Sequence, residues 1–322
     1  MGLERCAVLT SAARAIAAVV LAVALLAACS DSGTTDVAGG SPTASSTSTP
    51  TTIGTFGVER RTETFVDESR PTVDGAGDEV APTRTLVTEI YVPDGTGPFP
   101  LIVHAHGMDG HPRKFRQLLA HWAEHGYVVA APAFPLTNDE IDERVVGDFV
   151  NQPADVSFVI DEVLALAADP DSPLSGIVDE STIGVSGLSL GGATTYGVGL
   201  HSCCLDERVD AIQVFDGIRL GFPDGDYVER TVPLLIVHGT ADHVFAIETA
   251  RESFAAAQSP AFLVTLADGT HAAPFEDTES PHDAAVLDIT TRFWRAFLSD
   301  DADAEARLTV SPDPAVAQSE SR

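Results

Sequence analysis

Basic residues are scarce in this sequence. Its 322 residues include 18 Lys and Arg against 48 Asp and Glu, which gives a net charge of −30. Lys114 is the only lysine. A chain this acidic repels phosphate backbones, so the composition argues against nucleic acid as a partner.

Cysteines, long apolar runs and repeats are scarce as well. The four cysteines include no CxxC pair, which argues against a zinc finger or ribbon, and they are too few for a disulfide-built scaffold. Neither a Gly-X-Y repeat, a sustained heptad nor an internal repeat of about 20–50 residues occurs. The hydrophobic content of 44% is enough for a large core in one big domain or two smaller ones.

The N-terminus has the features of a secretory signal. Arg5 and Arg14 flank a basic start, and the apolar run Ala15–Ala28 is 14 residues long, shorter than the roughly 20 residues of a membrane-spanning helix. The run ends in Leu26-Ala27-Ala28-Cys29, which resembles the lipobox of bacterial lipoproteins. This resemblance implies cleavage of a signal peptide, residues 1–28, and lipidation of Cys29. The protein would then be anchored outside the cytoplasm, in the membrane of the bacterial envelope. An ordinary signal followed by a chance cysteine is the alternative.

Composition divides the remaining chain into three parts. Residues 29–56 are dominated by Ser, Thr, Gly and Pro and predict a flexible linker. Residues 57–299 predict the folded domain. Residues 300–322 form an acidic C-terminal tail that we expect to be poorly ordered.

Residues 57–299 alternate between predicted strands and predicted helices. Two early strands alternate polar and apolar residues, and the later ones are short continuous apolar runs, typical of a mostly parallel sheet buried on both faces. The predicted strands are Gly57–Asp67, Arg84–Val92, Leu101–His104, Tyr127–Pro132, Thr182–Val185, Val209–Phe215, Leu234–Val237 and Phe262–Leu266. The predicted helices are Phe115–Glu124, Ala154–Ala168, Ala246–Ala257 and Pro281–Leu298. This order predicts one α/β domain with helices on both faces of the sheet and ligands at the carboxyl ends of its strands.

The sequence Gly187-Leu188-Ser189-Leu190-Gly191 directly follows a predicted strand and precedes a helix-forming stretch. It is a G-x-S-x-G pattern in the strand–turn–helix context that a nucleophilic serine requires. Gly187 and Gly191, two positions before and two positions after Ser189, are small enough to allow a turn that raises the serine hydroxyl above the backbone. A glycine-rich turn with an uninvolved serine is the alternative.

A serine hydroxyl needs a general base, and the base needs an acid to orient it. Two later strand ends supply them, with Asp242 after Leu234–Val237 and His271 after Phe262–Leu266. Asp216, which ends an earlier strand, is the alternative acid. Other candidates have simpler explanations: Asp268 caps a turn, His238 packs inside, and His243 lines the pocket or faces solvent.

The segment His104–His111 contains three histidines and Asp109, which raises the question of a metal site. Its spacing does not fit the HxHxDH pattern of dinuclear metallohydrolases, and we expect no metal and no other cofactor. The His-Gly turn instead predicts that the amide of Met108 faces the substrate oxygen. The amide of Leu190 is the second expected donor of this oxyanion hole.

These motifs together resemble the α/β-hydrolase superfamily. Within it, the chain resembles Ser-dependent bacterial esterases that are similar to dienelactone hydrolases, platelet-activating-factor acetylhydrolases and chlorophyllases. The matching segments are Val66–Pro71, Tyr91–Pro93, Phe99–Val103 leading to His106-Gly107, Gly187–Gly192, His238–Asp242 and Gly269–His271. Dienelactone hydrolases use a cysteine nucleophile, whereas this chain has Ser189.

Two segments near the expected pocket leave alternatives open. The connection between the strands that end near Phe215 and begin near Pro233 is too short for a helical lid domain, so we expect no large lid. The acidic stretch Pro135–Asn151 is either a solvated loop or a rim that disfavours anionic substrates. The adjacent Cys203 and Cys204 form either a vicinal disulfide or two buried thiols.

The sequence therefore predicts an envelope-anchored serine hydrolase that cleaves small-molecule or lipid esters with Ser189, His271 and Asp242. Three other functions use the same scaffold: acyl transfer to a cell-wall acceptor, peptide hydrolysis, and ligand binding by a lipoprotein without catalysis. Because the serine, base, acid and both oxyanion positions are present together, we expect a catalyst.

Overall fold

A computed structural model describes residues 55–322 of the chain. The predicted signal peptide, Cys29 and nearly all of the predicted linker lie outside these residues. Phe56, at the end of that linker, packs edge-on against Phe99, and its amide donates to the carbonyl of Glu124. In the described part of the chain, no helix combines the length and the apolar character that crossing a bilayer requires.

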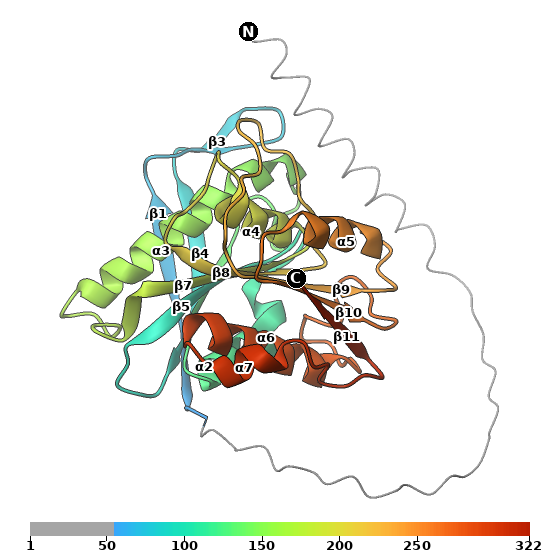
Figure 1. Ribbon diagram of the computed structural model, residues 1–322. Helices are drawn as coiled ribbons and strands as arrows, with labels where there is room; N and C mark the ends of the chain where they lie inside the picture. The colour runs from blue at the N-terminus through green and yellow to red at the C-terminus, as the bar shows by residue number, and fades with distance from the viewer. Residues whose placement is uncertain (1–54) are drawn as a thin grey trace, which may run out of the picture.

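The domain is built on a nine-stranded sheet with the order β1-β4-β6-β5-β7-β8-β9-β10-β11 (Figure 1). The neighbours from β6 to β10 run parallel, whereas the pairs β1–β4, β4–β6 and β10–β11 are antiparallel. The strands are β1 Val58–Asp67, β4 Arg84–Pro93, β5 Phe99–Ala105, β6 Val128–Ala133, β7 Val178–Leu188, β8 Val209–Phe215, β9 Leu234–Gly239, β10 Ala261–Leu266 and β11 Ala317–Ser321. A separate hairpin pairs β2 Thr72–Val73 with β3 Glu79–Ala81.

Helices cover both faces of the sheet (Figure 1). On one face lie α3 Gln152–Ala168, α4 Leu190–Leu200 and α5 Ile247–Ala256, which pack into one apolar cluster with the sheet. On the other lie α2 Arg116–Glu124, α6 Asp283–Leu298 and α7 Ala302–Arg307, which form the second cluster. Two short 3-10 helices, η1 Pro112–Phe115 and η2 Val146–Val150, lie in the connections around β6.

This architecture confirms the fold class predicted from the sequence: the chain has the α/β-hydrolase fold. Every predicted strand and helix is present, and several of the strands extend further than their apolar runs. The central strands are buried along most of their length, which explains why their sequences read as continuous apolar runs. In the described residues, the connection from β8 to β9 contains no helix, in agreement with the absence of a large lid.

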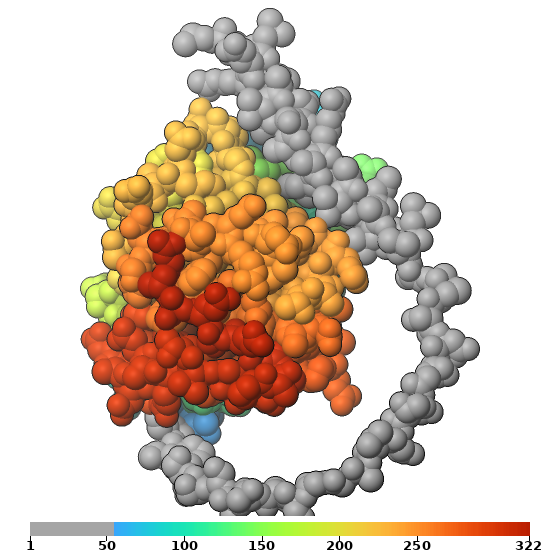
Figure 2. All heavy atoms as spheres, turned by 45° about the vertical axis from the view of Figure 1, so that its right-hand side comes forward, coloured from blue at the N-terminus to red at the C-terminus, as the bar shows by residue number. Residues whose placement is uncertain are grey.

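The C-terminal segment corrects the expectation of a poorly ordered tail. Residues 302–307 form α7, and β11 pairs antiparallel with β10, with Phe262 opposite Ser321 and Leu266 opposite Ala317. Figure 2 shows this dark-red segment lying across the orange surface of the preceding elements. Backbone hydrogen bonds to an exposed strand edge order a segment whose own composition gives little apolar driving force.

A buried ion cluster fixes the segment before α3 to the sheet. The Arg84 guanidinium at the start of β4 contacts the carboxylates of Asp148 in η2 and Asp155 in α3 at 2.6–2.9 Å. All three side chains are almost completely buried, and Arg70 reaches Asp155 at 2.8 Å. Since η2 carries Val146 beside the candidate site, this cluster helps to hold one wall of that site.

Candidate active site

Ser189 occupies the sharp turn between β7 and α4. Its backbone has φ 57° and ψ −114°, a conformation that residues other than glycine rarely adopt. The turn ends the strand at Leu188 and begins the helix at Leu190, so Ser189 sits at the helix N-terminus. The side chain is partly exposed, as a nucleophile that meets substrate must be.

Two glycines make this turn possible. A Cβ atom at Gly187 would approach the carbonyl oxygen of Gly191 to 2.2 Å, and one at Gly191 would approach the carbonyl oxygen of Ala105 to 2.0 Å. Both distances are far inside van der Waals contact, so any larger residue would push the strand, the helix or β5 out of place. The G-x-S-x-G spacing is thus a packing requirement of this site.

The structure brings Ser189, His271 and Asp242 together in one hydrogen-bonded chain. Ser189 Oγ lies 2.8 Å from His271 Nε2, and His271 Nδ1 lies 2.7 Å from Asp242 Oδ2. The Asp242 side chain is fully buried, while the His271 side chain is 19% exposed. These three residues follow β7, β9 and β10, whose parallel carboxyl ends share one edge of the sheet.

His271 and Asp242 are each held in place by residues of the loops around them. The other carboxylate oxygen of Asp242 accepts the amides of Val244 at 2.7 Å and Phe245 at 3.1 Å. The Phe245 ring lies edge-on to the His271 ring, with centroids 5.5 Å apart. After His271, the loop is fixed by Phe275, whose ring stacks on Phe215 at 5.0 Å.

The remaining acid and histidine candidates lie around this chain but outside it. Asp216 is fully buried beneath Asp242 and bonds the amide of Gly239, with no direct hydrogen bond to His271. Asp268 is exposed in the turn that precedes His271, and His243 is also exposed. His238 is buried and contacts both Asp216 and Asp242, so it is more than a packed histidine.

The two residues whose amides are expected to form an oxyanion hole line the same pocket as Ser189. Met108, Ser189 and Leu190 all line it, and the position of a Cβ on Gly107 would be 3.7 Å from Ser189 Oγ. Leu190 is the first residue of α4, where an amide has no intrahelical acceptor. Within residues 55–322, neither the Met108 nor the Leu190 amide donates a backbone hydrogen bond.

The histidines before Met108 shape this turn. His106 Nδ1 lies 2.7 Å from the carbonyl oxygen of Gly107, and its Nε2 accepts the amide of Phe134 at 3.0 Å. His104 Nδ1 lies 2.9 Å from Ser186 Oγ. Burial lowers the pKa of His104 to about 3 and, despite its bond to Gly107, that of His106 to about 4. Both are therefore neutral residues that bond to the protein, and His111 caps η1 by accepting the amide of Arg113.

Beside Ser189 lies a pocket with almost entirely apolar walls. Met108 and Val146 line one part of it, and the loops after β8 and β9 line another. The complete lining is Met108, Val146, Ser189, Leu190, Ala193, Ile218, Leu220, Val244 and Phe245. No charged side chain is among them, so the pocket suits an uncharged group.

The acidic stretch that includes Asp139 is paired with the only lysine of the chain, a connection that the sequence did not reveal. Asp139 contacts Arg113 at 2.5 Å and Lys114 at 3.3 Å, and Arg144 contacts Asp109 at 2.5 Å. Burial acts to raise the pKa of Asp139, but Lys114 and Arg113 lower it overall. These ion pairs join η1 to the loop before η2, whereas Asp142 and Glu143 of the same stretch are exposed to solvent.

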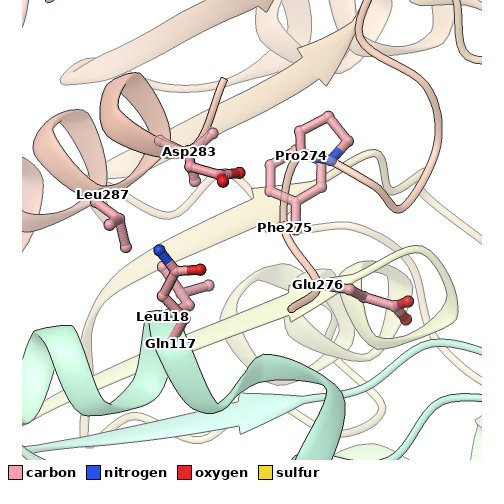
Figure 3. A pocket seen from close by; sticks show the side chains of 8 residues that line it. Gln117, Leu118, Pro274, Phe275, Glu276, Asp283 and Leu287 are labelled. Atoms are coloured by element: carbon pink, nitrogen blue, oxygen red, sulfur yellow. The ribbon is translucent and has the colours of Figure 1, made fainter. Parts of the chain in front are cut away.

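A second hollow lies between α2 and α6, next to the loop that follows His271 (Figure 3). Its lining is Gln117, Leu118, Pro274, Phe275, Glu276, Asp283, Val286 and Leu287, and it contains none of Ser189, Asp242 and His271. Burial raises the pKa of Glu276, whereas the charges of Lys114 and His271 act to lower it. This hollow is separate from the pocket beside Ser189.

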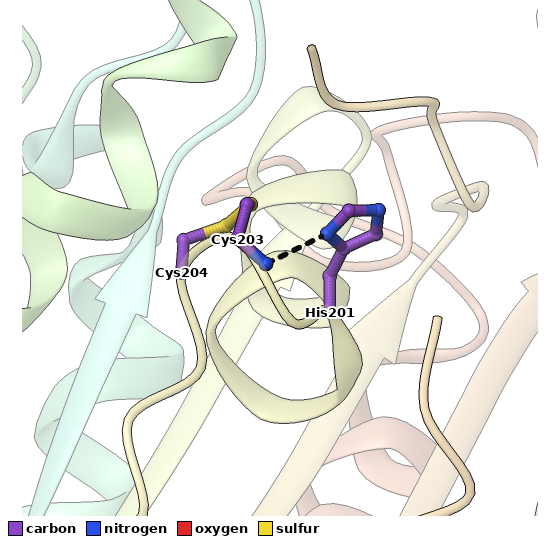
Figure 4. A group of neighbouring side chains, drawn as sticks. All are labelled: His201, Cys203 and Cys204. Carbon is purple, nitrogen blue, oxygen red and sulfur yellow. Dashed lines mark hydrogen bonds between the residues drawn. A yellow bond between two sulfur atoms is a disulfide. The ribbon is translucent and has the colours of Figure 1, made fainter. Parts of the chain in front are cut away.

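Cys203 and Cys204 form a disulfide in the structure, which resolves the alternative that the sequence left open. The pair follows the C-terminal end of α4, at the opposite end of the helix from Ser189 (Figure 4). The amide of Cys203 donates to His201 Nδ1 at 3.3 Å. The three side chains therefore belong to the far end of the helix and take no part in the site.

Comparison with known proteins supports a hydrolase. Residues 62–218 match the family model described as Chlorophyllase, a range that contains Met108, Ser189 and Leu190 but ends before Asp242 and His271. Two relatives are both described as the uncharacterized protein YfhR, from Escherichia coli O157:H7 and from Escherichia coli strain K12. Each is 24% identical to this chain over 209 residues, covering 58% of this chain and 69% of the relative. The chain is thus similar to chlorophyllases over residues 62–218, and this match, together with the α/β-hydrolase fold, indicates a hydrolase.

Proposed function

We propose that the protein is a serine esterase that cleaves carboxylic esters through an acyl-enzyme intermediate. The observation that carries this proposal is the contact of Ser189 Oγ with His271 Nε2 at 2.8 Å, with His271 held in turn by Asp242 at 2.7 Å. A hydroxyl with a base on one side and an oriented, buried carboxylate behind that base is the arrangement that acyl transfer requires.

The chemistry follows from these contacts. His271 Nε2 removes the Ser189 proton while Oγ bonds to the ester carbonyl carbon, and the amides of Met108 and Leu190 donate to the oxyanion that forms. The bond to the alcohol oxygen then breaks, and His271 gives its proton to the departing alcohol. A water molecule repeats the sequence on the acyl-enzyme, so that the carboxylic acid leaves and Ser189 regains its proton.

The pocket beside Ser189 suggests the kind of ester. Because its walls are apolar and it adjoins the two proposed oxyanion donors, it suits an uncharged acyl chain next to the carbonyl carbon. A carboxylate in the acyl chain would be desolvated there without a cationic partner in the lining, which is costly. We therefore propose neutral acyl esters as the substrate class.

A fluorophosphonate probe and an ester panel test this function. The wild type should label once, at Ser189, and should hydrolyse p-nitrophenyl butyrate much faster than the p-nitrophenyl monoester of succinate or the matching anilide. Ser189→Ala should lose both labelling and hydrolysis while its unfolding temperature stays nearly unchanged. A wild-type protein that neither labels nor hydrolyses any ester would contradict the proposal, and preference for the anilide would make the protein an amidase.

We also propose that the esterase is attached to the outer side of the membrane through a lipid on Cys29. The support is the sequence alone: a basic start, the apolar run 15–28 and the following cysteine. The Ser, Thr, Gly and Pro-rich segment after Cys29 would give the folded domain room to move above the lipid surface.

A further inference from the structure

Behind Asp242 lies a second, completely buried polar pair, His238 and Asp216. His238 belongs to the end of β9, and Asp216 directly follows the neighbouring strand β8. Both side chains have 0% exposure. His238 Nε2 lies 3.4 Å from Asp242 Oδ2, the same oxygen that His271 contacts, and His238 Nδ1 lies 3.5 Å from Asp216 Oδ1. The polar chain that begins at Ser189 therefore continues past the acid.

Neighbouring backbone groups fix where the protons lie in this pair. The carbonyl oxygen of Phe245 is 2.8 Å from His238 Nε2, and because a carbonyl can only accept, this nitrogen carries a hydrogen. The amide of Gly239 donates to Asp216 Oδ1 at 2.8 Å. Within the described residues, neither His238 Nδ1 nor Asp216 Oδ2 has a hydrogen-bond partner, although both side chains are completely buried.

Two lone pairs would face each other between His238 Nδ1 and Asp216 unless a proton lies there. Burial, and after it the charge of Asp242, raises the pKa of Asp216 well above its ordinary value, against the lowering effect of the Gly239 amide. Burial also lowers the pKa of His238. These directions favour a neutral carboxylic acid that donates to a neutral imidazole.

We propose that His238 and Asp216 are positioning residues of the active site, in which one proton between them keeps the His238 Nε2–H directed toward Asp242 and the loop of Phe245. This inference rests on the proposed serine esterase. His238 then supports the acid in two ways. Its Nε2–H lies 3.4 Å from the Asp242 Oδ2 that His271 also contacts, and its bond to the Phe245 carbonyl holds the loop whose amides bind the other oxygen.

The arrangement has a measurable consequence for the base. A carboxylate that accepts an additional N–H attracts the proton gained by His271 less strongly, because part of its negative charge is already compensated. The charged and titratable groups around His238 are Asp216 after β8, Asp242 after β9, His271 after β10 and Glu248 in α5. Removal of the His238 donor should therefore raise the pH at which kcat/KM falls to half its maximum on the acid side.

Two variants at position 238 test this. His238→Gln keeps an N–H near the position of Nε2, whereas His238→Met has similar bulk and no donor. On p-nitrophenyl acetate, Gln should stay within about threefold of the wild type. Met should lower kcat by about tenfold, equivalent to ~1.4 kcal/mol of barrier, with a smaller change in KM, and should shift the acid-side half-maximum to higher pH by roughly half a unit. A folded Met variant with unchanged kcat and pH profile would overturn the proposal.

Position 216 gives a second test that does not depend on whether the Met variant folds. Asp216→Asn is uncharged and, at the position of Oδ1, which makes both contacts, it can either donate to His238 Nδ1 or accept from Gly239, so its activity and pH profile should stay close to those of the wild type. Asp216→Leu can do neither and should behave like His238→Met. If Asp216→Asn were as damaging as Asp242→Asn, Asp216 would act as an ionised acid, and the shared-proton arrangement would be wrong.

A structural readout separates this inference from the proposed function. In nitrogen-15 NMR of the wild type at neutral pH, His238 should show a hydrogen on Nε2 and none on Nδ1, whether or not any ester is hydrolysed. The opposite tautomer would overturn the pairing even in an active enzyme. A protein that shows this tautomer but fails to label at Ser189 would instead contradict the esterase.

Discussion

At the residue scale, two strand ends use backbone conformations that only glycine adopts easily. Ser189 after β7 has φ 57°, and Asp216 after β8 has φ 40°. Each such residue costs on the order of 1–3 kcal/mol and persists only where the surrounding structure determines it. Here one conformation raises the hydroxyl of Ser189 toward His271, and the other turns the Asp216 carboxyl beneath Asp242. A positive φ thus occurs both at the reacting residue and at the residue that we propose to support its acid.

The width of the apolar pocket should set the acyl chain that the enzyme prefers. Ile218 lines the pocket, and its truncation in Ile218→Ala leaves space for additional methylene groups. Each buried methylene is worth about 0.8 kcal/mol, a factor of about four, so kcat/KM for p-nitrophenyl hexanoate relative to acetate should rise by at least about fourfold. Val80→Ala in β3, a valine that is 54% exposed and does not line the pocket, is the matched control and should leave the ratio unchanged. An unchanged ratio in Ile218→Ala would show that the acyl chain lies elsewhere.

The raised pKa of Asp216 makes a prediction about stability. A carboxyl that holds its proton more tightly in the folded state stabilises the fold fully below the unfolded pKa of about 3.9. That contribution is lost as the pH rises through the higher folded pKa, at up to about 1.4 kcal/mol per pH unit. The side chain of Asp216→Asn does not titrate. As the pH increases above 4, the free energy of unfolding of this variant should therefore rise relative to that of the wild type. Urea titrations of both proteins from pH 4 to pH 8 measure this, and a difference that stays constant with pH would contradict it.

At the element scale, the sequence predicted most of the sheet and the order of the site residues. Continuous apolar runs predicted the central strands. Ser189, Asp242 and His271 each follow a strand of the parallel sheet, which placed all three at one edge of it. β9 does lie beside β10, so Asp242 reaches His271 without crossing a strand. What stayed hidden were contacts between distant segments, such as Arg84 with Asp148 and Asp155, because single charged residues carry no signal of their partners.

The strand β11 could not be predicted from its own residues. Ala317-Gln318-Ser319-Glu320-Ser321 has neither apolar alternation nor β-branched residues, and its order comes from the free edge of β10. The same reasoning explains why the other strands extend beyond the apolar runs from which they were predicted. Their polar ends pair with neighbours even where the apolar run has stopped, and the pairing partner is not visible in the local sequence.

Proline substitutions in β11 should show how the ladder holds the C-terminal segment. Ala261 and Arg322 donate to and accept from each other, so they are a hydrogen-bonded pair of the antiparallel ladder. Such pairs alternate with pairs that are not hydrogen-bonded, which makes Gln318 direct its amide toward β10 and Ser319 direct its amide away from it. Gln318→Pro removes a ladder bond and should lower the free energy of unfolding by about 1–3 kcal/mol. Ser319→Pro removes none and should cost clearly less. Chemical denaturation of both variants checks this, and equal effects would mean that β11 does not pair in this register.

At the scale of the whole molecule, an acidic body is combined with an apolar reaction pocket. The net charge of −30 keeps the surface strongly anionic, yet the carboxylates Asp109 and Asp139 near the pocket are paired with arginines and with Lys114. The anionic surface would repel negatively charged molecules at long range, in agreement with neutral acyl esters as substrates. A domain of this charge would also be repelled by anionic lipids, so a stable position at a membrane calls for an anchor outside the domain.

The proposed lipid on Cys29 supplies that anchor, and its removal should release the enzyme. In a bacterial host that processes lipoproteins, Cys29→Ala should move the protein from the membrane fraction to the soluble fraction. The substitution removes the residue to which the proposed lipid would be attached, and without acyl chains the anchoring is lost. Its esterase activity per molecule should stay unchanged, since Ser189, Asp242 and His271 all lie in the folded domain. Cys6→Ala is the matched control, because Cys6 belongs to the segment that cleavage would remove, and this variant should stay with the membrane. Fractionation measures the release, incorporation of an alkyne-labelled fatty acid measures lipidation, and hydrolysis of p-nitrophenyl butyrate measures the activity. Membrane association that survives Cys29→Ala would show that another segment of the chain binds the envelope.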